Sequence, residues 1–220
     1  MSVAPKNAQR FQRRPEARPE ELLDSALTVF GQRGYRATTL EEVAKHAGVS
    51  KGTVYLYFSS KDDLFRAMVE KNVIAMIESA EARVREHTGS AAELLETMMR
   101  TMWAKLSQSQ MVCVTRLVQS ELPQFPEIQR YYWENVIQRH RRLLRAIVDR
   151  GVANGEFRPE AVAMVPTMVP ALIVQLNHVR ALFGGLDPEG PTPEEQIESI
   201  LSLVFDGIRQ RPPLAQEQRG

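Results

Sequence analysis

The sequence is poor in cysteine: Cys113 is the only one in 220 residues. One thiol cannot form an intramolecular disulfide or supply a cysteine-rich metal site, so this scarcity favours a reducing compartment. We therefore expect a cytoplasmic protein. A nucleophilic thiol assembled in space with distant residues stays an alternative, although a lone cysteine on an apolar helix is usually an ordinary packing residue.

Other common chemical motifs are missing as well. The four histidines have no metal-ligand spacing, such as two histidines four residues apart, and there is no glycine-rich phosphate loop. The sequence therefore predicts a protein that is not an enzyme and that needs no metal and no cofactor.

Long uninterrupted hydrophobic runs are also absent. The longest uncharged run spans residues 161–179 and contains Pro166, Pro170, Gln175 and His178. A membrane-spanning helix needs about 20 predominantly apolar residues, so this run predicts a buried helix and no membrane association. The two prolines predict either a bend that shapes a cavity or an interface, or a helix that begins only near Pro170.

The chain has almost no net charge. Its 28 Lys and Arg residues nearly balance 27 Asp and Glu residues, for a formal charge of +1. Residues 1–61 are locally basic, with ten Lys or Arg against six Asp or Glu, which weakly favours a DNA-binding end on a neutral chain. We expect residues 1–17 to form a flexible basic arm without a secretory signal and residues 212–220 to form a disordered tail.

What the sequence does contain is helical periodicity. Apolar residues recur three and four positions apart and no strand-like alternation stands out, so the predicted fold is all-α. Helices are expected at residues 20–33, 40–47, 51–58, 61–87, 91–108, 110–121, 126–154, 159–183 and 192–209. They should form a small N-terminal module, residues 18–65, and a larger helical module, residues 66–211, linked by the helix at 61–87.

Three helix starts follow one another within residues 38–61. A helix-capping residue precedes each start: Thr39, Ser50 and Ser60. Gly48 can adopt positive φ, so the first of these helices can stop sharply before the second begins. Two short helices joined by such a turn are typical of a helix-turn-helix, which places its second helix in the major groove of DNA.

In this stretch the sequence resembles the TetR (tetracycline-repressor) family of bacterial regulators. The matching residues are Phe30, Gly34-Tyr35, Thr38-Thr39, Ala44, Ala47-Gly48-Val49-Ser50, Gly52-Thr53, Tyr55, Tyr57-Phe58, Ser60-Lys61 and Leu64. The resemblance covers about residues 20–66. It implies that residues 18–65 form a DNA-binding domain and that residues 66–211 form a domain for ligand binding and dimerisation.

The resemblance also implies which residues contact DNA. They are Thr39 at a helix start, Lys51, Gly52, Thr53, Tyr55, Tyr57 and Lys61. Lysine, threonine and tyrosine donors suit phosphate oxygens, and helix N-termini add amide donors. Leu56 departs from the family, whose members often carry a polar, basic or aromatic residue there. A base contact at this position would have to be apolar or absent.

One recognition helix reads only a few base pairs. A palindromic operator on double-stranded DNA therefore calls for a homodimer with its two reading helices about one DNA turn, roughly 34 Å, apart. The apolar helices at 159–183 and 192–209 are the candidates for a four-helix bundle between two copies, and the resemblance implies the same. The alternative is that these helices only close the core of one chain.

Methionine and aromatic residues concentrate in the middle of the chain. A mostly apolar cavity with a few polar groups suits a small organic effector, and the resemblance implies an inducer site here. The candidate ligand residues are Met102, Trp103, Met111, Arg116, Phe125, Tyr132, Trp133, Gln175 and His178. The alternative is that they only form core.

A basic run follows on the helix at 126–154. It consists of Arg139, His140, Arg141, Arg142 and Arg145. An anionic ligand or a DNA backbone could use it, but we expect a solvated helix face.

Together these features predict a dimeric transcriptional repressor that a small, largely apolar ligand releases from its operator. The ligand would shift the population of dimer states towards one with the wrong separation of reading helices. Two other classes stay open. One is a helical interaction protein that keeps the fold without regulating DNA, and the other is a ligand-binding or catalytic protein that uses the central cavity.

Overall fold

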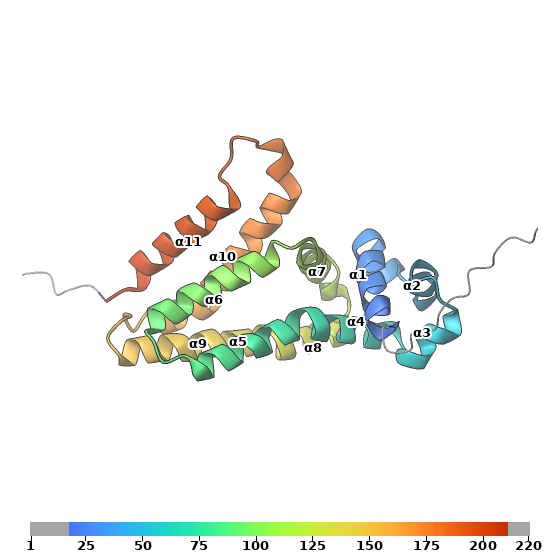
Figure 1. Ribbon diagram of the computed structural model, residues 1–220, viewed down its shortest axis with the longest axis horizontal. Coiled ribbons are helices and arrows are strands. Elements are labelled where there is room, and N and C mark those ends of the chain that lie inside the picture. The colour runs from blue at the N-terminus through green and yellow to red at the C-terminus, as the bar shows by residue number, and fades with distance from the viewer. Residues whose placement is uncertain (1–17, 211–220) are drawn as a thin grey trace, which may run out of the picture.

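A computed structural model describes residues 18–210 of the chain (Figure 1). The arm expected at residues 1–17 and the tail expected at residues 212–220 lie outside the described residues. Helices joined by short connections make up the described part, whose only extended pairing is one isolated bridge between Phe157 and Arg209. The predicted all-α fold is confirmed.

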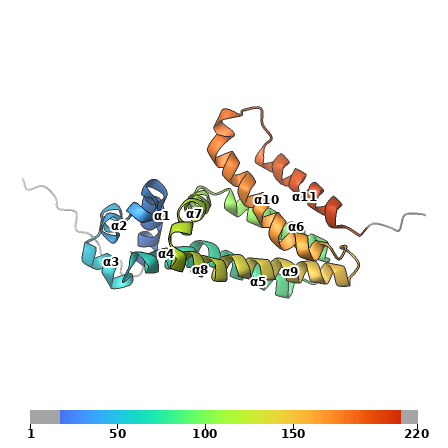
Figure 2. The same ribbon diagram turned by 180° about the vertical axis from the view of Figure 1, so that it is seen from behind.

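The helices follow one another in an elongated molecule with α1 to α3 at one end (Figures 1 and 2). The α-helices are α1 (Arg18–Ala37), α2 (Leu40–His46), α3 (Lys51–Tyr57), α4 (Lys61–Val69), α5 (Ala75–Glu86), α6 (Ala91–Leu106), α7 (Ser109–Ser120), α8 (Pro126–Tyr132), α9 (Gln138–Ala153), α10 (Ala161–Phe183) and α11 (Pro193–Ile208). Two short 3-10 turns are η2 (Leu122–Gln124) and η4 (Gly184–Leu186), and two π-helical turns are η1 (Glu70–Ile74) and η3 (Trp133–Ile137).

Side-chain caps start the short helices where the sequence predicts them. The Thr39 hydroxyl accepts from the Glu42 N–H at 3.3 Å, while the Glu42 carboxylate accepts from the Thr39 N–H at 2.9 Å. Ser50 caps α3 and Ser60 caps α4 in the same way, without the reciprocal bond. Gly48 has a φ of 67° between α2 and α3, which only glycine adopts at little steric cost.

The first helix and α7 form a junction between the two ends of the molecule. The Arg36 N–H donates to the Glu121 carboxylate at 3.1 Å, and the Arg116 guanidinium donates to the Gly31 carbonyl. A Cβ on Gly31 would lie 3.2 Å from the Cys113 sulfur, so the two helices pack closely here. The lone cysteine is part of this packing.

Two π turns interrupt the two longest helical stretches, and they contact each other. A π turn carries one more residue than an α-helical turn and changes the backbone hydrogen bonding. In each turn an asparagine amide donates to the carbonyl four residues earlier: Asn72 to Met68 at 2.8 Å and Asn135 to Tyr131 at 2.9 Å. These side chains bind carbonyls next to the irregular backbone.

The tenth helix spans Ala161–Phe183, close to the predicted 159–183, and it excludes one of the two alternatives for its prolines. It runs without a break through Pro166 and Pro170, so a helix start near Pro170 is wrong. It is also not buried along its whole surface in the single chain. Four of its large apolar side chains are 42–58% exposed: Met168, Val179, Leu182 and Phe183. By length and composition alone, the segment Ala161–Leu186 could span a membrane. Only 28% of an apolar 18-residue stretch within this segment is buried.

Candidate DNA-reading helix and effector cavity

Helix α3 stands at one end of the molecule with its outer side uncovered (Figure 1). Val54 and Phe58 are buried and attach the helix to the rest of the module. The exposed side chains and backbone belong to Lys51, Gly52, Tyr55, Leu56 and Tyr57. Thr53 is half-buried, with its hydroxyl 2.8 Å from that of Ser50. Most residues expected to read DNA therefore share one accessible face.

An acidic residue of α2 holds two of these side chains. The Lys51 ammonium forms an ion pair with the Glu41 carboxylate, and the Tyr55 hydroxyl donates to the same carboxylate at 3.4 Å. The ammonium also lies 5.5 Å from the centre of the Tyr55 ring. The hydrogen bond between Lys51 and Glu41 lowers the pKa of Glu41 and raises the pKa of Lys51. Lys51 is thus a fully charged group whose partner a DNA phosphate would have to replace.

Two other expected DNA contacts are occupied within the protein. Lys61 donates to the carbonyls of Tyr35 at 2.8 Å and Arg36 at 3.2 Å, with its ammonium 4.6 Å from the Tyr35 ring centre. Burial lowers the pKa of Lys61. Its ammonium is bound to the two carbonyls at the end of α1, and a DNA phosphate would have to compete with them. The hydroxyl and N–H of Thr39 are likewise bound to Glu42.

A cavity of about 390 Å³ lies between α5, α6, α7, α9 and α10, and we call it the effector cavity. Its volume is within the range of small-molecule sites. Val73, Ile77, Met102, Met111, Val136 and Val174 form much of its apolar wall. The polar lining consists of Thr115, Gln119, Tyr132, His140, Arg141 and Thr167. Pro166 and Pro170 also line it, so the proline-containing part of α10 borders the cavity.

Three of the nine predicted ligand residues line the effector cavity: Met102, Met111 and Tyr132. Burial raises the pKa of Tyr132 to about 12, so its hydroxyl remains a hydrogen-bond donor at neutral pH. Gln175 is exposed on α10, and His178 also lies outside the lining.

The other four predicted ligand residues have structural contacts elsewhere. Trp103 is buried, and the central carbon of the Arg180 guanidinium lies 5.4 Å from the centre of the Trp103 ring. Arg116 holds α1, and Phe125 packs on Tyr35 with ring centres 4.7 Å apart. Trp133 is exposed beside Arg141. Aromatic content therefore located the right region of the chain but did not separate core residues from lining residues.

The basic run on α9 is not uniformly a solvated face. Arg139 pairs with acidic residues of α5, and Arg145 pairs with Asp149. His140 and Arg141, in contrast, line the effector cavity. Helical phase could have identified His140, because it lies four residues after Val136 and four before Leu144, both of which are buried.

His140 gives a prediction about acid stability. Burial lowers its pKa from 6.5 to about 4. The unfolded chain therefore binds a proton below pH 6.5 that the folded chain does not bind until about pH 4. Stability should fall as the pH drops through this window, by a few kcal/mol at most, since one pKa unit corresponds to about 1.4 kcal/mol. Denaturant unfolding between pH 7 and pH 4.5 measures the effect.

The control for this prediction is His140→Gln, which cannot take up the proton. Carboxylates also titrate near the lower end of the window, so the informative quantity is the difference between the two proteins. Equal pH dependence of unfolding in the parent and the variant would show that His140 does not contribute.

Comparison with known proteins agrees with this geometry. Residues 22–68 match the bacterial regulatory proteins of the tetR family, and residues 85–204 match the tetracyclin repressor-like C-terminal domain. The chain belongs to the TetR family. This TetR-family protein is a ligand-responsive, DNA-binding transcriptional regulator, and its relatives are regulators.

Named relatives of this TetR-family chain include repressors. The HTH-type transcriptional repressor KstR2 of Mycolicibacterium smegmatis is 30% identical over 206 residues, which cover 89% of this chain and 93% of that protein. The fatty acid metabolism regulator protein of Bacillus subtilis is 26% identical over 138 residues, covering 63% of this chain and 70% of that protein.

Solved structures show the same fold. The fatty acid degradation regulator FadR from Bacillus halodurans superposes with a TM-score of 0.72 at 20% identity, covering 91% of this chain and 100% of that one. FadR from Bacillus subtilis in complex with stearoyl-CoA also gives 0.72, at 23% identity, covering 86% of this chain and 99% of that one.

Proposed function

We propose that this regulator is a homodimeric repressor that binds a palindromic operator in the cytoplasm and releases it when a small, largely apolar effector fills the effector cavity. In this proposal residues 18–65 bind DNA, and residues 66–211 bind the effector and the second copy. The observation that carries the proposal is the exposed outer face of α3, with Lys51 and Tyr55 at its surface.

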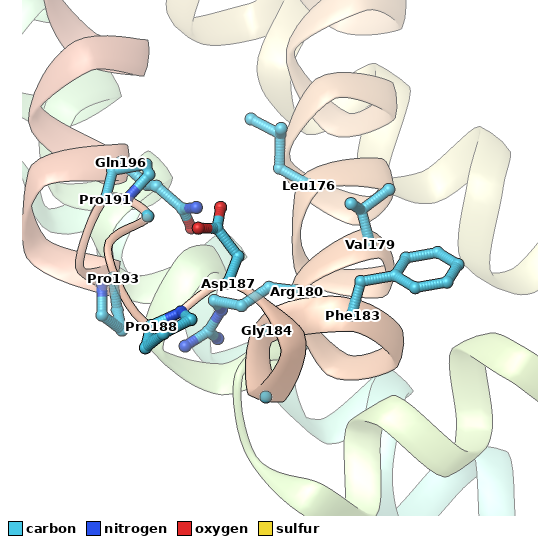
Figure 3. Close-up of a pocket in the computed structure, with 12 residues that line it drawn as sticks. Leu176, Val179, Arg180, Phe183, Gly184, Asp187, Pro188, Pro191, Pro193 and Gln196 are labelled. Carbon is cyan, nitrogen blue, oxygen red and sulfur yellow. The ribbon is translucent and has the colours of Figure 1, made fainter.

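Support for the second copy comes from α10 and α11. A hollow of about 480 Å³ separates the end of α10 from the segment that leads to α11 (Figure 3). A second groove of about 270 Å³ runs between Leu172 and Leu176 of α10 and Leu203 of α11. Leu182 and Phe183 of α10 and Leu203 of α11 are also exposed, and exposed apolar patches are typical of an interaction surface. Two such helix pairs can close into a four-helix bundle, which would cover the side of α10 that the single chain leaves exposed.

Support for the effector comes from the cavity and from the relatives. One relative is named for fatty acid metabolism, and one neighbouring structure contains stearoyl-CoA. A cavity with an apolar wall and a few polar groups would accept an acyl chain or another elongated apolar body. We therefore place the effector of this protein among acyl compounds.

Helix α7 provides a physical route from the effector to DNA. It lines the cavity with Thr115 and Gln119, and it holds α1 through Arg116 and through Glu121 just beyond its end. Suppose that the protein has two conformations, which differ in the placement of α7 and therefore in the orientation of α1. A ligand with a higher affinity for one of them would shift the population towards it. Because α1 packs against α2, and α2 packs against α3, the separation of the two reading helices in a dimer would change with the orientation of α1.

Replacement of Lys51 tests the DNA-binding face. Lys51→Ala should lower operator affinity by on the order of tenfold or more and reduce the slope of log affinity against log salt by about 2, one for each protomer. Quantitative gel shifts at several salt concentrations measure both. Glu41→Gln, which frees Lys51 from its acidic partner, should raise affinity. Arg145→Ala, a cation exposed on α9, is the control and should change neither quantity. Unchanged affinity and slope in the Lys51 variant would contradict the proposal.

A further inference from the structure

The lining of the effector cavity has an unusual charge distribution. Arg141 is its one permanently charged residue, and no Asp or Glu contributes to the lining in the part of the chain that the structure describes. His140, the other titratable base, stays neutral at pH 7 because burial lowers its pKa to about 4. A mostly apolar cavity thus presents one positive charge.

The Arg141 guanidinium is held in position but has no counterion among the residues that the structure describes. Its Nη2 donates to the Thr167 hydroxyl at 3.3 Å, and its central carbon lies 5.3 Å from the centre of the Trp133 ring. Within residues 18–210 it has no carboxylate at ion-pair distance, whereas Arg139 and Arg145 on the same helix do. Of its five N–H donors, most remain unused.

This arrangement favours an anion. A cation beside an apolar wall loses hydration, and a partner of opposite charge offsets that cost. A guanidinium matches carboxylate and phosphate oxygens with two parallel hydrogen bonds. The Trp133 ring and the Thr167 hydroxyl fix the guanidinium on one side, so less side-chain entropy is lost when an anion binds.

We propose that Arg141 binds the negatively charged head group of the effector while its apolar chain occupies the cavity. The inference rests on the effector role proposed above and narrows the ligand to an anionic amphiphile. The anion could be the carboxylate of a free acid or a phosphate of a larger head group such as that of coenzyme A. Both place an oxyanion at the same guanidinium.

The test compares three probes that share one acyl chain: laurate, methyl laurate and lauroyl-CoA. Calorimetric binding to the full-length protein should be on the order of 10- to 100-fold tighter for at least one anionic probe than for the ester, the range expected for hydrogen bonds to a charged group. Arg141→Met should abolish this preference and leave ester binding nearly unchanged. Arg142→Met, the exposed neighbour outside the lining, should behave as the parent protein.

The outcomes separate the possibilities. Preference for laurate identifies a carboxylate, and preference for lauroyl-CoA alone identifies a phosphate of the head group. Equal affinity for acid, thioester and ester, a preference that survives in Arg141→Met, or no binding of any probe overturns the role of Arg141. Operator release is measured separately. Arg141-dependent binding without release would contradict the proposed function and leave the anion site standing.

Discussion

Replacing Leu203 with Glu is expected to leave the chain folded but monomeric, and to lower operator affinity by on the order of 100-fold or more, the gain that two linked contacts provide. Leu203 is 67% exposed on α11, so a carboxylate there stays in water in the single chain. In a symmetric dimer the same substitution occurs twice and would place two unpaired charges in or beside the apolar contact. Light scattering after size exclusion gives the mass, and gel shifts give the affinity.

Ala146→Glu is the matched control for the dimer prediction. Ala146 is exposed on α9, which lies on the opposite side of the molecule from α11 in both views (Figures 1 and 2). This variant adds the same charge and should remain dimeric with parental affinity. If Leu203→Glu also remained a dimer that binds the operator tightly, α11 would not form the contact between copies.

Gly151→Ala should cause the largest loss of stability among single-methyl changes. An added Cβ would lie 2.1 Å from Cδ2 of Phe157, a side chain that is only 1% exposed. Phe157 also neighbours Phe205, with ring centres 6.4 Å apart, and forms the bridge to Arg209. Displacing it should therefore loosen α11 as well. We expect a loss of about 2 kcal/mol despite the better helix propensity of alanine. For a chain of this size the midpoint of thermal unfolding should fall by roughly 4–8 °C.

Gly52→Ala is the comparison variant for Gly151→Ala. It adds the same methyl group to a helix, but at a position with open space around the new Cβ. The nearest atom to its new Cβ would be the Ser50 hydroxyl, at 3.9 Å. Alanine should stabilise α3 by up to about 1 kcal/mol, yet operator affinity should fall if DNA approaches the backbone closely here. Calorimetric unfolding compares the two variants directly. Equal stability of Gly151→Ala and the parent protein would show that the Phe157 contact can relax.

Local signals predicted the N-terminal module of the fold well. Capping residues, glycine at a positive φ and apolar spacing all act within a few residues of each other, and they placed α1 to α4 closely. The π turns were not anticipated, because a single additional residue in a long apolar pattern barely changes its periodicity. The course of α10 through two prolines depends on packing against α6, α7 and α9, which no local pattern encodes.

The two candidate sites, the outer face of α3 and the effector cavity, were predictable to different degrees. The outer face of α3 follows from the positions of Val54 and Phe58, since what remains on a short helix must face outward. The orientation of Lys61 was not predictable, because it depends on carbonyls at the end of α1, about 25 residues away in sequence. The effector cavity is lined by residues of α5 to α10 and of the π turns η1 and η3. Whether an aromatic residue lines it or packs behind it is therefore a property of the assembled structure.

The π turns η1 and η3, which contact each other, also indicate where the chain can lose a residue. Each residue advances a helix by about 100°, so deleting Glu78 or Ser79 of α5 would rotate the buried Ala80 by that angle relative to the buried Ile77, and the two could no longer face the core together. A π turn already contains the additional residue, and its loss would restore an ordinary α-helix while the flanking segments keep their phase. Deletion of one residue should therefore be tolerated at either π turn, where it can reshape the wall of the effector cavity while the flanking helices keep their phase.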